Sequence, residues 1–156
     1  MEINIENLQT KLRLDPPRIS KIIRRILKHE HISTAALSFV FVSRQKIAAL
    51  NKKYLGRTYA TDVLAFDLTN QESPKPSRTK DRILCGDVII STDAVVKNAV
   101  EFETSSAHEL VLYVIHGMLH LIGYDDHKPA DIKKMRAKEQ ELMKVVNKDI
   151  KNVIRS

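Results

Sequence analysis

Residues 110–127, "LVLYVIHGMLHLIGYDDH", decide the fold because they join an almost entirely apolar helix to a polar turn. Apolar side chains occupy nearly every face of the helical part, and its prominent polar positions are His116 and His120. A helix that is apolar nearly all round is normally covered by the rest of the domain. Gly123 ends it, because glycine readily adopts the backbone conformation that follows many helices. We therefore expect this helix at the centre of the domain.

Strands and further helices are predicted around this central helix from apolar periodicity and from capping residues. The expected strands are residues 3–5, 36–42, 63–68 and 84–91. The expected helices are residues 18–29, 44–54 (capped by Ser43, with Ile47, Leu50 and Tyr54 inward), a segment from Thr92 or Asp93 to about Phe102, the central helix from Ser105 or Ser106, and residues 131–154. Residues 69–82 lack periodicity and predict a mobile loop.

This order of elements predicts an α+β fold, with α/β-like character, over residues 1–156 as a single domain. A small mixed sheet of about four strands should pack around the central helix, with the other helices outside. A chain of 156 residues is long enough for one such core and too short for two comfortable ones.

Composition narrows the classes of function. No run of about 18 apolar residues is present, so we expect no membrane partner and a cytoplasmic protein. The single cysteine, Cys85, excludes an internal disulfide and a cysteine-based zinc cluster. The formal net charge is +7, which is compatible with a polyanionic partner such as a nucleic acid.

The two histidines of the central helix predict a metal site. Because His116 and His120 are four residues apart, their side chains lie on one helix face and can reach one ion. A third ligand must come from the turn after Gly123, where both Asp126 and His127 are candidates. The ligand preference of zinc favours His127. We expect one divalent ion per chain, with zinc as the expected ion.

Three protein ligands leave a coordination position for water, which is the arrangement of a catalytic rather than a structural zinc ion. Zinc peptidases often carry H-E-x-x-H, in which the glutamate is the general base. Here that position is Gly117, so peptide hydrolysis by this route is disfavoured.

The motif "HGMLHLIGYDDH" resembles the signature H-G-x-L-H-L-x-G-Y-D-H of the YbeY family of bacterial endoribonucleases. Two further stretches resemble the same family: residues 50–66, "LNKKYLGRTYATDVLAF", and residues 86–91, "GDVIIS". The resemblance implies a zinc-like ion on three ligands and single-strand-specific cleavage of RNA. It also implies a role in maturing the 3′ end of 16S ribosomal RNA and in ribosome quality control, with the small-subunit RNA precursor and small-subunit ribosomal proteins as partners.

The chain departs from the family pattern at two positions. The third histidine of the common signature comes ten residues after the first, where this chain has Asp126, and its histidine follows at position 127. Register against the signature therefore favours Asp126 as the third ligand. The family arginine that lines the cleft is replaced by Leu55, and Arg57 is the nearest arginine. We expect Arg57 to take over the binding of a phosphate.

Further roles are assigned as hypotheses. Asp125 is a candidate for proton transfer, and His108 and Glu139 are candidates for supporting the metal ligands from behind. Two alternatives stay open: an assembly factor for ribosomes whose metal is structural, and a metal hydrolase that acts on another substrate.

Overall fold

The structure is a computed structural model that describes residues 1–57, 61–69 and 83–155. Within these residues, four strands form one sheet in the order β1-β2-β4-β3. The strands are β1 (Glu2–Asn7), β2 (Thr34–Val42), β3 (Val63–Asp67) and β4 (Ile83–Ser91). β1 and β4 both run parallel to β2, whereas β3 is antiparallel to β4. The sheet is therefore mixed, as the sequence predicted.

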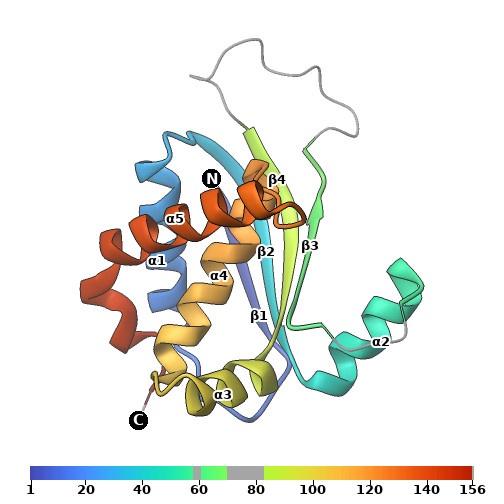
Figure 1. Cartoon of the computed structure of the whole chain (residues 1–156). Coiled ribbons are helices and arrows are strands. Elements are labelled where there is room, and N and C mark those ends of the chain that lie inside the picture. Colours follow the sequence, from blue (N-terminus) through green and yellow to red (C-terminus); the bar gives the residue numbers. More distant parts are fainter. Residues whose placement is uncertain (58–60, 70–82, 156) are drawn as a thin grey trace.

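Two helices lie on opposite sides of this sheet (Figure 1). Helix α1 (Pro16–His29) begins after Asp15, whose carboxylate accepts a hydrogen bond from the Arg18 backbone N–H. Helix α2 (Arg44–Leu55) is capped by Ser43, as predicted, and ends at Gly56, where φ is +66°. Tyr54 was expected to point inward, but it is 58% exposed and contacts Phe66 edge to face.

The second half of the chain is helical, with α3 (Thr92–Glu101), α4 (Ser106–Ile122), α5 (Pro129–Val145) and a 3₁₀ helix, η2 (Asn147–Asn152). The predicted cap of α3 at Thr92 or Asp93 is wrong. Ser91 caps this helix by accepting a hydrogen bond from the Ala94 backbone N–H, while the Thr92 hydroxyl donates to the Val42 carbonyl. The predicted cap of α4 is confirmed at Ser105.

The prediction of one continuous helix to residue 154 is also wrong, because α5 ends at Val145 and η2 follows it. The apolar periodicity nevertheless continues, since Val146, Ile150 and Val153 are all buried. Apolar spacing reports which side chains face the core, and it does not distinguish an α-helix from a 3₁₀ continuation. Most of the predicted loop at residues 69–82 lies outside the described residues, which include only Thr69 of it.

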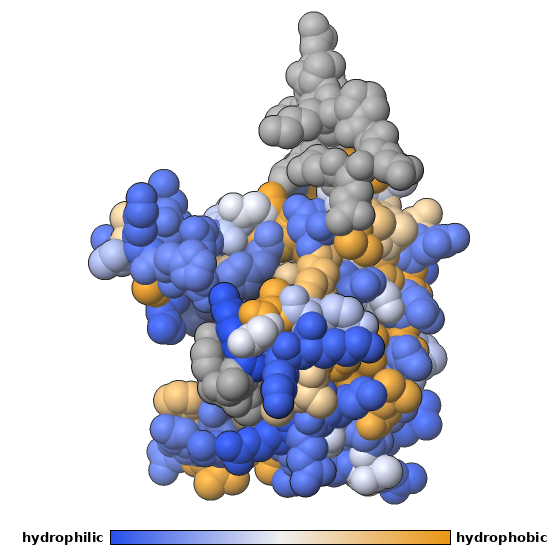
Figure 2. Space-filling view, turned by 90° about the vertical axis from the view of Figure 1, so that its right-hand side faces the viewer, coloured by the Kyte–Doolittle hydropathy of each residue, from blue (hydrophilic) through white to orange (hydrophobic). Residues whose placement is uncertain are grey.

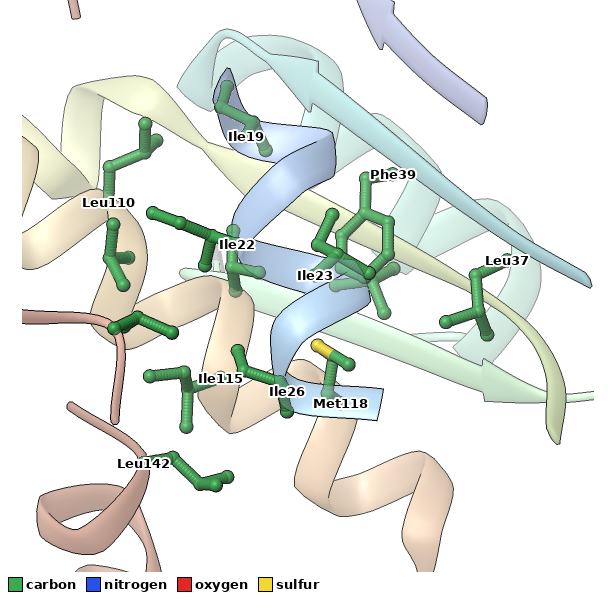
Figure 3. Packing of buried hydrophobic residues seen from close by; sticks show 14 of the residues in the cluster. Ile19, Ile22, Ile23, Ile26, Leu37, Phe39, Leu110, Ile115, Met118 and Leu142 are labelled. Atoms are coloured by element: carbon green, nitrogen blue, oxygen red, sulfur yellow. The ribbon is translucent and has the colours of Figure 1, made fainter. Parts of the chain in front are cut away.

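The core lies between the sheet and the helices α1, α4 and α5. Ile22, Ile23 and Ile26 of α1 meet Phe39 of β2 and Met118 of α4 there (Figure 3). All five side chains are at most 1% exposed. At about 1.5–3 kcal/mol for burying each such side chain, this layer stabilises α4 in the interior.

Helix α4 approaches the sheet closely because glycine faces the contact. A Cβ atom on Gly117 would lie 2.5 Å from Cγ1 of Val88 on β4, which is too close for two carbon atoms. On the sheet side, a Cβ atom on Gly86 would lie 2.6 Å from the Phe66 carbonyl oxygen and 2.7 Å from Leu121. Gly117 thus faces the sheet and not the histidine face, so a glutamate at this position would enter the core.

A smaller hydrophobic cluster lies on the other face of the sheet. It is built around Val42, Ile47 and Leu64, and α2 covers it. Figure 2 looks at the molecule from the side that is on the right in Figure 1, and shows a largely hydrophilic surface with hydrophobic patches between the polar side chains. Over the described residues, no helix is both long and apolar enough to span a membrane.

We predict that Gly117→Ala destabilises the protein by about 1–3 kcal/mol, because the added methyl group overpacks the contact with Val88. An alanine in an exposed helix interior would instead be favourable by about 1 kcal/mol. Urea unfolding followed by circular dichroism measures the free energy of unfolding.

The double variant Gly117→Ala/Val88→Ala is the matched control. Removing the Val88 methyl groups makes room for the new Cβ atom, so the two changes should be less destabilising together than the sum of the single changes. A purely additive result would show that α4 is not held at this distance by Val88.

Candidate metal centre in an open cleft

The imidazoles of His116 and His120 face each other on α4. Their Nε2 atoms are 3.1 Å apart, and the rings meet edge to face with centroids 4.6 Å apart. Both side chains are partly buried, which matches their place on the one edge of α4 that other elements leave open. The predicted helical spacing therefore brings the two nitrogens to one point.

Asp126 supplies a third potential ligand atom at the same point. Its Oδ2 atom lies 3.6 Å from Nε2 of His116 and 3.5 Å from Nε2 of His120. A tetrahedral ion with bonds of about 2.0–2.1 Å places its ligand atoms roughly 3.3 Å apart. The close approach of the two imidazoles does not by itself explain a carboxylate oxygen that is nearly equidistant from both Nε2 atoms. The triangle has the dimensions of one face of a tetrahedral metal site.

Both imidazoles are held with their Nε2 atoms toward this triangle. Nδ1 of His116 is 2.7 Å from Oε2 of Glu139, which is buried on α5. Since a carboxylate only accepts, Nδ1 carries the proton and Nε2 keeps its lone pair. His120 is hydrogen-bonded to the Tyr124 backbone. Glu139 thus lies behind His116, where the sequence hypothesis put it.

The protonation state of His120 also suits a ligand. Burial lowers the pKa of His120, and the neighbouring His116 lowers it further, while the carboxylates of Asp126 and Asp125 act in the opposite direction. The net result is a pKa below 6.5, so the imidazole is neutral at pH 7. Metal ions bind the neutral form of histidine.

His127 lies away from the two helical histidines. Its side chain is 81% exposed, and its Nε2 atom is 3.4 Å from Oδ1 of Asp125. The Asp125 carboxylate also accepts a hydrogen bond from the Asp126 backbone N–H, at 2.7 Å. The turn therefore directs Asp126 toward His116 and His120, while it leaves His127 paired with Asp125.

The three ligand atoms lie in a cleft of about 1070 Å³ between β3, α3, α4 and α5. Arg57 lines it from the segment after α2, and Arg136 lines it from α5, one helical turn before Glu139. Both arginines are exposed, and neither guanidinium is paired with a carboxylate in the described part of the chain. Leu55 lines the same cleft. Arg136 was not singled out from the sequence.

A second group of polar residues in the cleft was also missed. The Tyr113 hydroxyl donates to Oδ2 of Asp62 at 3.1 Å and accepts from Nδ2 of Asn98. Burial raises the pKa of Tyr113, and the Asp62 charge and hydrogen bond raise it further, so the phenol is protonated at neutral pH. Tyr113 precedes His116 by three residues, so helical spacing was a usable signal. Asp62 lies in the stretch 50–66 that resembles the family, which was a usable signal, whereas nothing local signals Asn98.

His108 is not brought to the candidate ligands. It lies at the beginning of α4, about two helical turns before His116, and lines a separate hollow with Asn147 and Lys148. Its Nε2 atom is 3.7 Å from Glu109, a buried carboxylate that does line the cleft.

A further group of potential ligands, His29, Glu30 and Glu141, lies elsewhere. Lys138 already pairs with the carboxylates of Glu30 and Glu141, at 2.9 Å and 2.7 Å. These three residues are therefore satisfied without an ion.

Two imidazoles and one carboxylate in an open cleft are typical of hydrolytic metal sites. Comparison with known proteins is consistent with this class. The sequence model of the family Endoribonuclease YbeY matches residues 4–147. An Endoribonuclease YbeY from Salinibacter ruber is 35% identical, over 92% of this chain and 91% of its own. One from Pelotomaculum thermopropionicum is 34% identical, over 94% and 98%.

The fold has a counterpart among solved structures. A Thermotoga maritima protein, whose structure was determined in solution, superposes with a TM-score of 0.64 at 25% identity, and 96% of this chain and 93% of that one are covered. The chain belongs to the YbeY family of endoribonucleases. Its α+β fold and its enzyme class, a nuclease hydrolase, are those expected from the sequence.

We predict that the purified protein loaded with Zn²⁺ and dialysed retains one ion per chain, and that Asp126→Ala and His120→Ala lose it. His127→Ala should retain it, because the imidazole of His127 lies outside the triangle. Elemental analysis by mass spectrometry measures the stoichiometry.

Glu139→Gln should weaken zinc binding without abolishing it. Loss of a hydrogen-bond partner behind a metal ligand typically lowers affinity about 10- to 100-fold. Circular dichroism of each variant checks that the fold is intact. Loss of the ion from His127→Ala, with retention in Asp126→Ala, would assign the third ligand to His127 instead.

Proposed function

We propose that the protein is a metal-dependent endoribonuclease that cleaves single-stranded RNA, with His116, His120 and Asp126 holding one divalent ion, most suitably Zn²⁺. The observation that carries the proposal is the triangle of Nε2, Nε2 and Oδ2 atoms at 3.1–3.6 Å, open to the cleft. When bound, such an ion supplies a Lewis acid and a water molecule whose pKa is lowered toward about 7.

The residues around the triangle suit phosphodiester hydrolysis. Glu139 and the Tyr124 backbone orient the two imidazoles, so no reorganisation is needed when the substrate enters. Asp125 is exposed in the same cleft and next to Asp126, so we assign it the transfer of a proton between the attacking water and the leaving oxygen. His127, 3.4 Å from Asp125, is in reach to modulate this carboxylate.

Arg57 and Arg136 suit phosphate binding because each guanidinium is exposed and has no carboxylate partner in the described ranges. The family arginine is absent at Leu55, and Arg57 is two residues further on the same side of the cleft. Arg136 lies on α5, beside Glu139. Two arginines from different elements hold a bent backbone better than one can.

The substrate we propose is the precursor of small-subunit ribosomal RNA, with maturation of the 3′ end of 16S RNA and ribosome quality control as the cellular role in the cytoplasm. Family membership and a net charge of +7 support it. Small-subunit ribosomal proteins are the proposed further partners. An assembly factor with a structural ion is the alternative, because the basic surface would serve RNA binding without cleavage equally well.

We expect cleavage of a labelled single-stranded RNA that ends in the 16S 3′ precursor sequence to fall by more than about 100-fold in His116→Ala, because even changes behind a ligand cost about 10- to 100-fold. Cleavage by the wild type should stop on dialysis against a chelator and return on addition of Zn²⁺ or Mn²⁺. Denaturing gels measure the rate.

Val100→Ala, at an exposed residue that does not line the cleft, is purified in parallel as the control and should cut the RNA as fast as the wild type. Cleavage that survives complete loss of the ion would contradict the proposal and favour the assembly factor. Double-stranded RNA of the same sequence tests the strand preference.

We predict that Arg57→Ala and Arg136→Ala each lower kcat/KM by about 10-fold and reduce the slope of log affinity against log salt by roughly 1, because each removes one phosphate contact. Fluorescence anisotropy with a labelled RNA measures the slope. Arg24→Ala, an exposed arginine on α1 outside the cleft, is the matched control. An effect of Arg24→Ala as large as that of Arg136→Ala would show that only overall charge matters.

A further inference from the structure

One exposed aromatic side chain lines the cleft. Phe102 follows the last turn of α3 and is 60% exposed, although its ring belongs to the same cleft as His116 and His120. Single exposed hydrophobic residues are normal on protein surfaces, and Val100 on the same helix is 78% exposed. Phe102 differs from Val100 in its place, because Val100 does not line the cleft.

A preorganised polar network adjoins Phe102. Asn98 lies one helical turn before Phe102 on α3 and donates to the Tyr113 hydroxyl, which in turn donates to Asp62. This network ties the end of α3, α4 and the start of β3 together on one wall. Oδ1 of Asp62 has no hydrogen-bond partner among the described residues, and Asp62 is exposed. An acceptor atom and an exposed aromatic ring therefore line the same cleft.

This wall is within one nucleotide's reach of the candidate metal centre. Tyr113 and His116 are three residues apart on α4, which places their Cβ atoms about 5–6 Å apart on one helix face. An RNA strand whose scissile phosphate lies at the metal centre would bring the adjacent nucleotide to Phe102. Arg57 and Arg136, on other parts of the cleft lining, are positioned for the backbone rather than for the base.

We propose that Phe102 and Asp62 form a subsite for one unpaired nucleobase next to the scissile phosphate. The base stacks on the Phe102 ring, and Oδ1 of Asp62 accepts a hydrogen bond from its edge. Stacking on an exposed aromatic side chain is the general mode by which proteins bind single-stranded nucleic acid. The subsite rests on the proposed RNA substrate and deepens it, because only an unpaired base can be stacked in this way.

The chemistry of Asp62 adds a preference among bases. A carboxylate only accepts hydrogen bonds, so it favours bases that present more N–H donors. Adenine, cytosine and guanine each present an amino group, whereas uracil presents a single imino N–H, so uracil is the least favoured base. Tyr113 and Asn98 act as positioning residues, since they hold the carboxylate and touch it or each other rather than the reacting atoms.

The test is an abasic scan. Single-stranded RNA oligonucleotides with one abasic site at each position around the cleavage site are cut by the metal-loaded wild type, Phe102→Ala, Phe102→Trp and Val100→Ala. In the wild type, one abasic position next to the cleaved bond should lower kcat/KM by roughly 5- to 100-fold, the range of base stacking. Phe102→Ala should cut intact RNA more slowly by a similar factor. In this variant, an abasic site at the sensitive position should cause no further loss of kcat/KM, whereas the effects of abasic sites at other positions should not change. Phe102→Trp should keep the penalty at that position, because an indole ring also stacks on a base. Val100→Ala should behave as the wild type, because Val100 does not line the cleft.

Two results would overturn the subsite. In the first, the abasic penalty persists unchanged in Phe102→Ala, whether or not this variant cuts intact RNA more slowly. In the second, Val100→Ala reproduces the effect of Phe102→Ala. In each of these cases the wild type still cuts RNA, so the proposed function survives. Wild-type protein that neither binds nor cuts the RNA overturns the proposed function and the subsite together.

A second readout isolates Asp62 without relying on folding. Replacing the base at the sensitive position by uracil should slow the wild type several-fold, whereas Asp62→Asn, whose amide can also donate, should cut the two substrates at similar rates. Equal rates for all four bases in the wild type would overturn the role of Asp62. Circular dichroism and the zinc content of each variant show that the metal centre is intact.

Discussion

The burial of α4 on all sides but one is the constraint on which the rest of the structure depends. Gly117 lets the helix lie against β4 so closely that a single methyl group would collide with Val88. Apolar side chains of α1 and α5 cover the other apolar faces of α4 in the same core. The rotation of about 100° per residue then leaves His116 facing the one open edge, and His120 returns to that edge one turn later. The same packing that stabilises the fold therefore aims both imidazoles into the cleft.

Three parts of the chain build the candidate metal centre: α4, α5 and the turn that follows α4. α4 supplies the two imidazoles, and α5 supplies the buried Glu139 that holds the proton on Nδ1 of His116. The turn that begins at Gly123, where φ is +122°, supplies the carboxylate of Asp126. Burial keeps His120 neutral by lowering its pKa, and the carboxylate of Asp126 completes the triangle from the solvent side. The two arginines that line the cleft, Arg57 and Arg136, are separate from the three candidate ligands.

The two departures from the family signature have related consequences. A carboxylate in place of a third imidazole lowers the net charge of a bound ion and favours harder metals than three histidines would. Leu55 removes a guanidinium from one wall, while Arg57 and Arg136 offer two others. Both changes lie in segments that line the cleft, and neither disturbs the apolar contacts of α4.

Local pattern in the sequence determined the central helix, the paired imidazoles, the four strands and the fold class, because each depends on spacing along a single element. It could not decide between Asp126 and His127 as the third group, since the direction of a side chain after a glycine turn depends on what packs behind the turn. Apolar spacing likewise ran through Val146 into η2 and did not reveal the change of helix type. The approach of Arg136, Asp62 and Asn98 to one another was not predictable, although Asp62 lies in the stretch 50–66 that resembles the family, because these residues come from distant segments. Only the tertiary structure brings these elements to one cleft, since contacts between distant segments are fixed by the packing of the whole core.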